Sequence, residues 1–362
     1  MSPNQLIPFA TSMNELISGI QQVGIGVPNA NEVWKWYRKT LGLNVPIFND
    51  EADAKLMTCY TSGEVRRRHA IMAVNMAGGG GVEIWQYKNR IPVEPTFEPK
   101  LGDLGIFSIK IKCLDVPKFY GQLATEEQKS SKSLSPEKLP HFWLRDCRNN
   151  LLQIVSNESW FRPNGYLTGG VCGAVIGVSD IDKAVKFYAD TLEIDQIVYD
   201  KTGTFEDFKF LGADKQKFRR VLLRKTLGKA GAFGKLLGGI EIELIQALDR
   251  TPRKIFEDRD WGDAGFIHLC FDALNMNALK QRCQTNGFPF TVDSADSFDM
   301  GEAAGRFSYV EDPDGTLIEF VETHKVPIVK KLGIYLNLKK RRKQTHLPDW
   351  MVATLGWGKV KD

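Results

Sequence analysis

Long apolar stretches are absent from this chain of 362 residues. No run approaches the length of about 18 apolar residues that a membrane-spanning helix needs. The first ten residues also lack the basic start and the apolar block of a secretory signal. These absences predict a cytoplasmic protein that has no membrane partner.

Cysteine motifs are absent as well. The six cysteines are scattered along the chain, and no two of them form a CxxC pair. The sequence therefore indicates neither a zinc knuckle nor a dithiol redox motif. Unpaired thiols are typical of a reducing compartment, which again favours the cytoplasm.

Charge gives little sign of a nucleic-acid partner. The formal net charge is +4, and much of the excess lies in a basic run at residues 339–343. Such a run can bind phosphate or an acidic partner, but it is more often a solvated face of a terminal segment. No RNA- or DNA-binding motif accompanies it, so we expect no nucleic-acid partner.

The composition that is present is typical of a folded protein. Hydrophobic residues make up 43% of the chain and charged residues 25%, which is the balance of a globular rather than a disordered protein. At about 150 residues per domain, the length suits two domains.

The main feature of the sequence is an internal repeat. A short apolar strand, a polar turn and a helix begin at residue 21 and again at residue 172. The two helices, 32–43 and 181–192, carry apolar residues at the i, i+3, i+4 spacing of a helix with one buried face. Both segments end in a strand with an inward glutamate at a matching position, Glu83 in one and Glu243 in the other.

A second pair of segments repeats a different pattern. Residues 105–110 align with residues 265–270, and residues 146–153 align without gaps on residues 312–319. The latter two stretches are typical of a hairpin turn that leads into a final strand. The order is therefore A-B-A′-B′, as if a protein of two modules had been duplicated.

The repeat predicts how the chain is divided. Modules one and two span residues 1–160, modules three and four span 161–325, and a basic tail covers 326–362. Residues 161–165 contain proline and glycine and form the expected seam, and residues 125–140 are expected to form an exposed loop. We expect each half to form an incomplete barrel whose concave side can hold a ligand.

This pattern resembles the vicinal oxygen chelate superfamily, which contains glyoxalases, bleomycin resistance proteins and dioxygenases. The resemblance covers residues 19–325, and its most specific parts are residues 312–319 and the strand that bears His268. It implies an α+β fold in which four βαβββ modules form two incomplete β-barrels. It also implies metal ligands on the first and last strands of a module, where inward-facing residues converge.

Each module offers two such positions. In chain order they are Gln22 and Glu83, Ser108 and Gln153, Gly173 and Glu243, and His268 and Glu319. Modules one and four thus supply an amide, two carboxylates and an imidazole, whereas modules two and three are poor in donors. Oxygen donors with one nitrogen suit one divalent metal ion such as Zn, Ni, Mn, Co or Fe.

Two pairings of the modules are open. In dioxygenase-like relatives adjacent modules share a site, which here would combine His268 and Glu319 with Glu243 and leave Gly173 at one corner. In glyoxalase I-like relatives the site joins modules of different pairs, here one and four. We favour the second pairing because it completes the ligand set of that family, Gln22, Glu83, His268 and Glu319.

Each candidate also has a structural interpretation. A buried histidine commonly belongs to a hydrogen-bonded core, and a glutamine on a strand commonly forms only hydrogen bonds. Glu319 and Glu83 lie in otherwise apolar strands, where an unpaired carboxylate would be costly to bury. The position of His268 in the repeat, opposite Ser108, favours a ligand role, whereas Glu243 can be a structural relic.

Three functions are consistent with these residues. The first is a metal-dependent glyoxalase-like lyase or isomerase, which acts through an enediolate on a small substrate with vicinal oxygens and uses Glu319 or Glu83 as the general base. The second is an Fe(II)-dependent dioxygenase that cleaves a ring or acts on a 2-oxo acid, although its usual ligand set contains two imidazoles. The third is a non-catalytic protein that sequesters a ligand, as bleomycin resistance proteins do. The partner is in each case a small molecule, and we expect a monomer or a homodimer.

Overall fold

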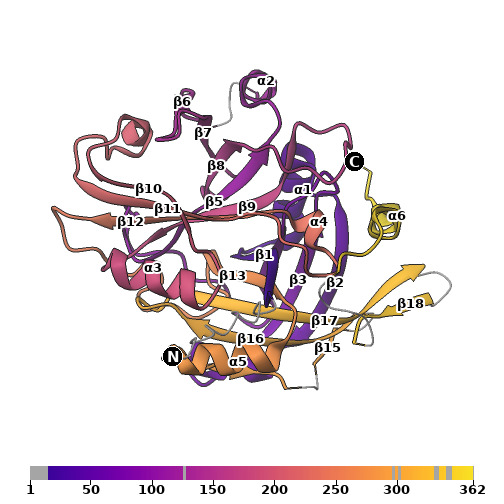
Figure 1. Ribbon diagram of the computed structural model, residues 1–362. Helices are drawn as coiled ribbons and strands as arrows, with labels where there is room; N and C mark the ends of the chain where they lie inside the picture. Colours follow the sequence, from indigo (N-terminus) through magenta and orange to yellow (C-terminus); the bar gives the residue numbers. More distant parts are fainter. Residues whose placement is uncertain are drawn as a thin grey trace, which may run out of the picture.

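Two curved β-sheets, each a half-barrel, make up most of the molecule (Figure 1). The computed structural model describes residues 15–124, 128–295, 298–300, 303–329, 334–339 and 345–361. Helices and strands are mixed along the chain, so the fold is α+β, as the repeat predicts.

Each module follows the strand–helix–strand order of the repeat. Module one contains β1 (Ile17–Gly26), α1 (Ala30–Leu41), β2 (Val45–Asp53), the 3-10 helix η1 (Lys55–Tyr60), β3 (Arg67–Val74) and β4 (Gly81–Tyr87). Module two contains β5 (Gly105–Cys113), α2 (Val116–Gln122), β6 (Ser133–Leu134), β7 (Pro140–Arg145) and β8 (Leu151–Ser156).

The second half repeats this order with insertions. Module three contains β9 (Thr168–Gly177), α3 (Ile181–Asp190), β10 (Gln196–Gly203), η2 (Glu206–Leu211), β11 (Phe218–Lys225), α4 (Gly234–Leu237) and β12 (Ile240–Ala247). Module four contains β13 (Gly265–Ala273), α5 (Met276–Thr285), β14 (Val292–Asp293), β15 (Phe298–Met300), β16 (Ala303–Glu311) and β17 (Leu317–Val329). The tail adds β18 (Ile334–Asn337), α6 (Asp349–Ala353) and η4 (Thr354–Gly358).

The two sheets join modules from opposite halves of the chain. In sheet A, β1 of module one pairs antiparallel with β13 of module four, and the strand order is β14-β16-β17-β13-β1-β4-β3-β2. In sheet B, β5 of module two pairs with β9 of module three, and the order is β10-β11-β12-β9-β5-β8-β7-β6. Modules one and four therefore meet, and the alternative pairing of modules three and four is wrong.

The expectation that each half of the chain forms its own barrel is wrong for the same reason. In every module one edge of the first strand is free to pair with the first strand of another module. The repeat does not predict which module supplies that partner strand. Here the partners come from opposite halves, so residues 1–160 contribute to both sheets. The spans 1–160, 161–325 and 326–362 describe the repeat along the sequence and stay a prediction as domain boundaries.

The strand register gives equivalent positions the same neighbours in both sheets. Residue pairs between neighbouring strands of sheet A have equivalent pairs in sheet B. The equivalent pairs are Gln22–Gly81 and Gly173–Glu241, Gly24–His268 and Val175–Ser108, and Cys270–Glu319 and Lys110–Gln153.

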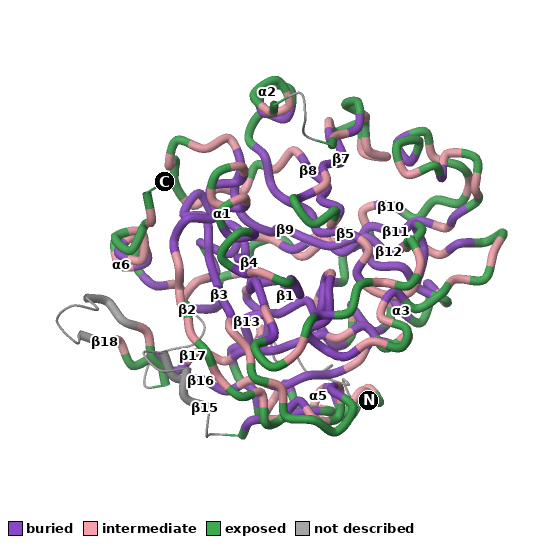
Figure 2. The backbone as a smooth tube through the Cα atoms, turned by 180° about the vertical axis from the view of Figure 1, so that it is seen from behind, coloured by how far each residue is buried: buried purple, intermediate pink, exposed green. Residues whose placement is uncertain are grey.

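The main hydrophobic core spans both sheets and the helices that pack on them. Helix α1 starts after Asn29, whose side chain accepts a hydrogen bond from the Glu32 backbone, and α3 starts in the same way after Asp180. The buried faces of α1, α2, α3 and α5 belong to one cluster with strand residues of both sheets. Figure 2 shows the central strands buried and the connecting loops exposed at the periphery.

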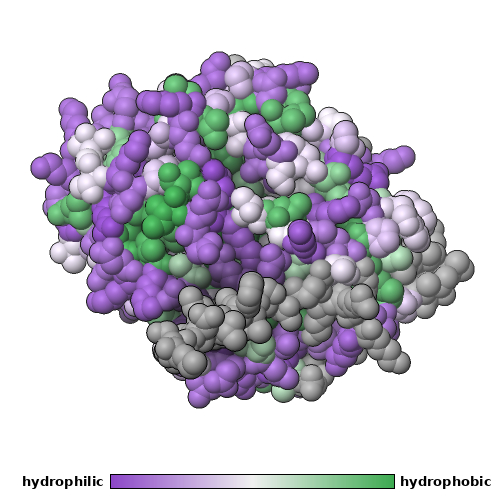
Figure 3. Space-filling model, viewed as in Figure 1, coloured by the Kyte–Doolittle hydropathy of each residue, from purple (hydrophilic) through white to green (hydrophobic). Residues whose placement is uncertain are grey.

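Hydrophilic side chains cover most of the face drawn in Figure 3, and apolar side chains gather there in smaller areas. In the described part of the chain, every helix is too short or too polar to cross a membrane. Of the basic run at 339–343, residues 340–343 lie outside the described residues. The loop expected at 125–140 contains β6, and its residues 125–127 also lie outside them.

Candidate metal centre

Four neighbouring strands bring the expected ligands together. Gln22 lies on β1, Glu83 on β4, His268 on β13 and Glu319 on β17, and these strands follow one another in sheet A as β17-β13-β1-β4. Most of their apolar neighbours in sequence belong to the main core on the other face of the sheet. Because side chains alternate along a strand, the four polar groups share the inner face of sheet A. We call these four residues centre A.

The polar atoms of centre A lie within contact distance of one another. His268 Nε2 lies 3.0 Å from Glu319 Oε2 and 3.4 Å from Glu83 Oε2. The Gln22 amide donates to the same two oxygens, at 3.2 Å to Glu83 and 3.5 Å to Glu319. One donor atom from each of Glu83, His268 and Glu319 lies within 4.8 Å of the others, which is close enough to hold one metal ion.

Centre A is buried and poorly neutralised. His268 is fully buried, and Gln22, Glu83 and Glu319 are no more than 8% exposed. Within the described residues, the two carboxylates have no ion-pair partner other than His268. The Nε2 atom of His268 is buried and lacks a well-oriented hydrogen bond to any described residue. Two buried carboxylates and the imidazole nitrogen that they share are the donor set expected for a divalent cation.

The electrostatics of centre A show the same need for positive charge. Burial lowers the pKa of His268, but the carboxylates of Glu319 and Glu83 outweigh it and raise this pKa to about 9. The pKa of Tyr309 lies well above its ordinary value because of burial and the same carboxylates. In the absence of a metal ion, the imidazolium form of His268 is the counter-charge.

Aromatic rings surround His268 and fix its position. Trp261 stacks on its ring with centroids 6.4 Å apart, and Tyr309 meets it edge-on at 5.5 Å. Trp85 in turn contacts Trp261 at 4.6 Å. Gly24, opposite His268, leaves the space for the imidazole, because a Cβ there would lie 2.4 Å from its Cε1 atom.

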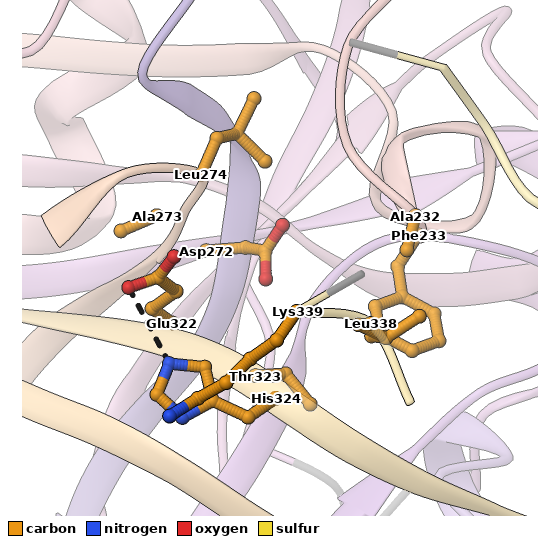
Figure 4. A pocket seen from close by; sticks show the side chains of 10 residues that line it. All are labelled: Ala232, Phe233, Asp272, Ala273, Leu274, Glu322, Thr323, His324, Leu338 and Lys339. Atoms are coloured by element: carbon orange, nitrogen blue, oxygen red, sulfur yellow. Dashed lines mark ion pairs between the residues drawn. The ribbon is translucent and has the colours of Figure 1, made fainter. Parts of the chain in front are cut away.

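Two cavities flank centre A without reaching it. One of about 420 Å³ is lined by Trp261 and Ile267, the residue before His268. The other, of about 40 Å³, is lined by Asp272 and Thr323, further along the strands that carry His268 and Glu319. Figure 4 shows the carboxylate of Asp272 beside this small cavity, near the ion pair of Glu322 with His324. No residue of centre A lines either cavity.

The equivalent place in sheet B has a different chemistry. Glu243 pairs there with Arg220 and with Lys110, whose Nζ lies 2.7 Å from Glu243 Oε2, and it accepts a hydrogen bond from the Tyr199 hydroxyl. Arg220 also binds Asp207, Nη1 to Oδ2, at 2.8 Å. We call Glu243 with these charged neighbours centre B.

The other expected positions of centre B supply no further charge. Ser108 donates only to the backbone of Ile109, Gly173 packs against Glu241, and the Gln153 amide lies 3.3 Å from His141 Nδ1. Burial raises the pKa of Glu243, but Arg220 and Lys110 outweigh it and hold this pKa far below its ordinary value.

The eight ligand positions expected from the sequence do not include the charged residues that surround Glu243 in centre B. Arg220, Lys110 and His141 lie at other inward positions of strands, and Asp207 lies on η2. A signal was available, because Arg220 and Lys110 are charged residues inside strands whose neighbours are apolar. Such residues are rarely buried unless they are paired.

Comparison with known proteins agrees with this geometry. The model of the Glyoxalase/Bleomycin resistance protein/Dioxygenase superfamily matches residues 174–309. The matched stretch is less than half of the chain and is similar to that superfamily, and the chain as a whole has the superfamily's fold. No curated protein matches the chain by sequence.

Two solved structures resemble the chain over most of its length. Glyoxalase I from Zea mays is 11% identical with a TM-score of 0.53, and the match covers 84% of this chain and 92% of that one. A putative dioxygenase from Bacillus subtilis is 12% identical with a TM-score of 0.53, and it covers 96% of this chain and 98% of that one. At these identities the likeness shows the superfamily fold and no particular reaction.

Proposed function

We propose that the chain is a metal-dependent enzyme of the glyoxalase-like type that holds one divalent ion at centre A. The observation that carries this proposal is the convergence of Glu83, Glu319 and His268 Nε2 in a buried place where, among the described residues, neither carboxylate pairs with a lysine or an arginine. Gln22 completes the set with an amide oxygen. The same four residues were expected from the sequence, where the resemblance to the vicinal oxygen chelate superfamily implies these positions as ligands.

A bound divalent ion would supply Lewis-acid activation of vicinal substrate oxygens. The chain supplies the proton transfer: Glu319 or Glu83 takes the proton from a carbon next to a carbonyl group. Gln22 contacts both carboxylates and keeps them oriented. Trp85, Trp261 and Tyr309 exclude water, which strengthens the electrostatic interactions inside the site.

The enclosure of centre A favours one alternative, a protein that binds its ligand without turnover. Its four side chains are almost inaccessible and line neither flanking cavity. A dioxygenase is less well supported, because the usual iron site has two imidazoles and the cluster of described residues contains one.

Metal content is the first test. We expect elemental analysis of protein purified without chelators to find one divalent ion per chain, and His268→Ala and Glu319→Ala to lose it. Ser108→Ala and Gln153→Ala should retain it. Stoichiometric metal in both His268→Ala and Glu319→Ala would refute centre A as the site.

Turnover is the second test. α-Hydroxycarbonyl compounds and the hemithioacetals of α-oxoaldehydes are incubated with the metal-loaded protein in D₂O, and NMR follows exchange of the proton next to the carbonyl. Glu83→Gln and Glu319→Gln should slow this exchange, with Gln153→Ala as the control. Metal binding without exchange would support the binding protein, and metal-dependent oxygen consumption would support the dioxygenase.

A further inference from the structure

A larger cavity lies between the two sheets, where the ends of β1, β5 and β13 meet. Its volume is about 540 Å³, which is within the range of small-molecule sites. Ile106, Phe107 and Phe266 give it apolar walls, and no residue of centre A or centre B lines it. We call this cavity the central cleft.

Three arginines line the central cleft, and two of them have carboxylate partners there. Arg148 Nη2 lies 2.6 Å from Glu94 Oε1, and Arg145 Nη2 lies 3.9 Å from Glu98 Oε1. These four side chains come from the end of β7, from the β7–β8 turn and from the loop after β4, and all four line the cleft. Three arginines and two glutamates therefore line the cleft, and the positive charge of the third arginine, Arg259, has no matching glutamate there.

Arg259 is held by backbone rather than by carboxylates. Its guanidinium donates to the carbonyl groups of Ala264 at 2.5 Å and Ile255 at 2.6 Å, and its Nε is buried with no partner among the described residues. Burial lowers the pKa of Arg259, and the carboxylates of Asp263 and Glu94 offset this only in part. An anion in the cleft would supply the missing counter-charge.

The repeat provides a matched cleft of opposite character. The 420 Å³ cavity beside Trp261 has Glu311 and Asp314 at the positions that Arg145 and Arg148 occupy in the central cleft. The basic lining is therefore a property of one cleft and is not required by the fold. Although Arg259 lines both cavities, an anion is favoured only on the basic side.

We propose that the central cleft is a second ligand site, which binds a small organic carboxylate with an apolar body. The carboxylate would lie against Arg259, because the planar guanidinium group presents N–H donors in a geometry that matches a carboxylate. The apolar body would lie on Phe107 and Phe266. This site is separate from the ion of centre A and does not depend on the proposed reaction.

Calorimetric titration of the full chain, in a buffer without phosphate and with a chelator present, tests this inference. The probes are 4-phenylbutanoate, the neutral 4-phenylbutan-1-ol and inorganic phosphate. We expect the carboxylate to bind at least about tenfold more tightly than either of the others. Equal binding by the alcohol, equal binding by phosphate or no binding of the carboxylate would each overturn the proposal.

Variants locate the bound probe. Arg259→Met should weaken carboxylate binding about tenfold, Arg259→Lys should weaken it less, and Arg148→Met should weaken it severalfold. Lys254→Met removes a positive charge from the acidic cleft and should leave binding unchanged. Circular dichroism checks that each variant is folded. Unchanged affinity in Arg148→Met together with a loss in Lys254→Met would place the probe elsewhere and overturn the assignment.

Discussion

Centre A and centre B occupy equivalent places in two sheets of the same strand order, yet they balance buried charge in opposite ways. Centre A sets two carboxylates against one imidazole. Centre B sets Glu243 and Asp207 against two permanent cations, Arg220 and Lys110. Where β5 carries Lys110, the equivalent residue of β13 is Cys270.

The difference shows two solutions to the same problem. Buried carboxylates require a nearby positive charge, because their desolvation is otherwise uncompensated. In centre B the side chains of Arg220 and Lys110 already balance the charge of the buried carboxylates. Centre A has only a titratable imidazole, so its charge balance is open to a proton or to a divalent ion. This contrast is the reason why we propose one metal ion per chain, at centre A.

The largest expected effect is on folding, at centre B. Arg220→Met leaves Glu243 with Lys110 and Asp207 with His141, and removing one partner from a buried ionic cluster typically costs about 3–5 kcal/mol. Urea denaturation in the presence of a chelator measures this loss. The matched change in centre A, Glu319→Gln, removes a carboxylate that lacks a permanent partner and should cost far less. Equal losses in the two variants would erase the contrast between the centres.

Neutralising the equivalent glutamates should separate metal binding from stability. Glu83→Gln removes one of two anionic ligands, so metal affinity should fall more than about tenfold, as measured by competition with a chelator. Glu243→Gln should leave the affinity unchanged within a few-fold and should lower the urea midpoint, because Arg220 and Lys110 lose their partner. Loss of affinity in Glu243→Gln, with none in Glu83→Gln, would place the metal in centre B.

Much of the fold was predictable because each module has its own local signal. Short stretches of sequence determine the strand–helix order, the hairpin at 312–319 and the spacing of the helices. Which modules share a sheet is a long-range property, because any first strand can pair along the free edge of another. The ligand set favoured the pairing of modules one and four. Strand composition alone could not distinguish this pairing from that of modules three and four.

The composition of centre A was predictable and that of centre B was not. Gln22, Glu83, His268 and Glu319 follow from the ligand positions that the resemblance implies, and the strand register brings these positions together. Arg220 and Asp207 come from β11 and η2, which hold no expected ligand position, and they meet Glu243 only in the folded chain. Enclosure by Trp261 also depends on the connection between modules three and four, which the repeat does not describe.

Further along the two equivalent strands, Asp272 of β13 matches Lys112 of β5, and this pair should give opposite pH responses. Asp272 is buried, accepts a hydrogen bond from Ser18, and has its pKa raised by burial from 3.8 to about 7. Between these values the unfolded chain ionises while the folded chain stays protonated, so stability should fall as pH rises from 3.8 to 7. The slope is at most about 1.4 kcal/mol per pH unit.

The difference in unfolding free energy between wild type and Asp272→Asn across this range isolates the contribution of Asp272. Lys112 serves as the control, because burial lowers its pKa from 10.5 and its titration therefore affects stability at alkaline pH. Lys112→Met should leave the acid-range profile unchanged. A flat difference between wild type and Asp272→Asn would mean that Asp272 is ionised in the folded protein.

The smallest expected effect tests the space that glycine leaves in centre A. Gly24 lies opposite His268, and its equivalent in sheet B is Val175, opposite Ser108. In Gly24→Ala the new methyl group would overlap the imidazole, which lies 2.4 Å from the Cβ position, so the ring must shift from the carboxylates. Overpacking of about 1 kcal/mol corresponds to roughly fivefold weaker metal binding. Val175→Ala removes apolar volume from sheet B and should leave metal affinity unchanged, although it should reduce stability slightly. Unchanged affinity in Gly24→Ala would mean that the position of His268 does not limit the site, because the substitution moves that ring while leaving all four proposed ligands in the chain.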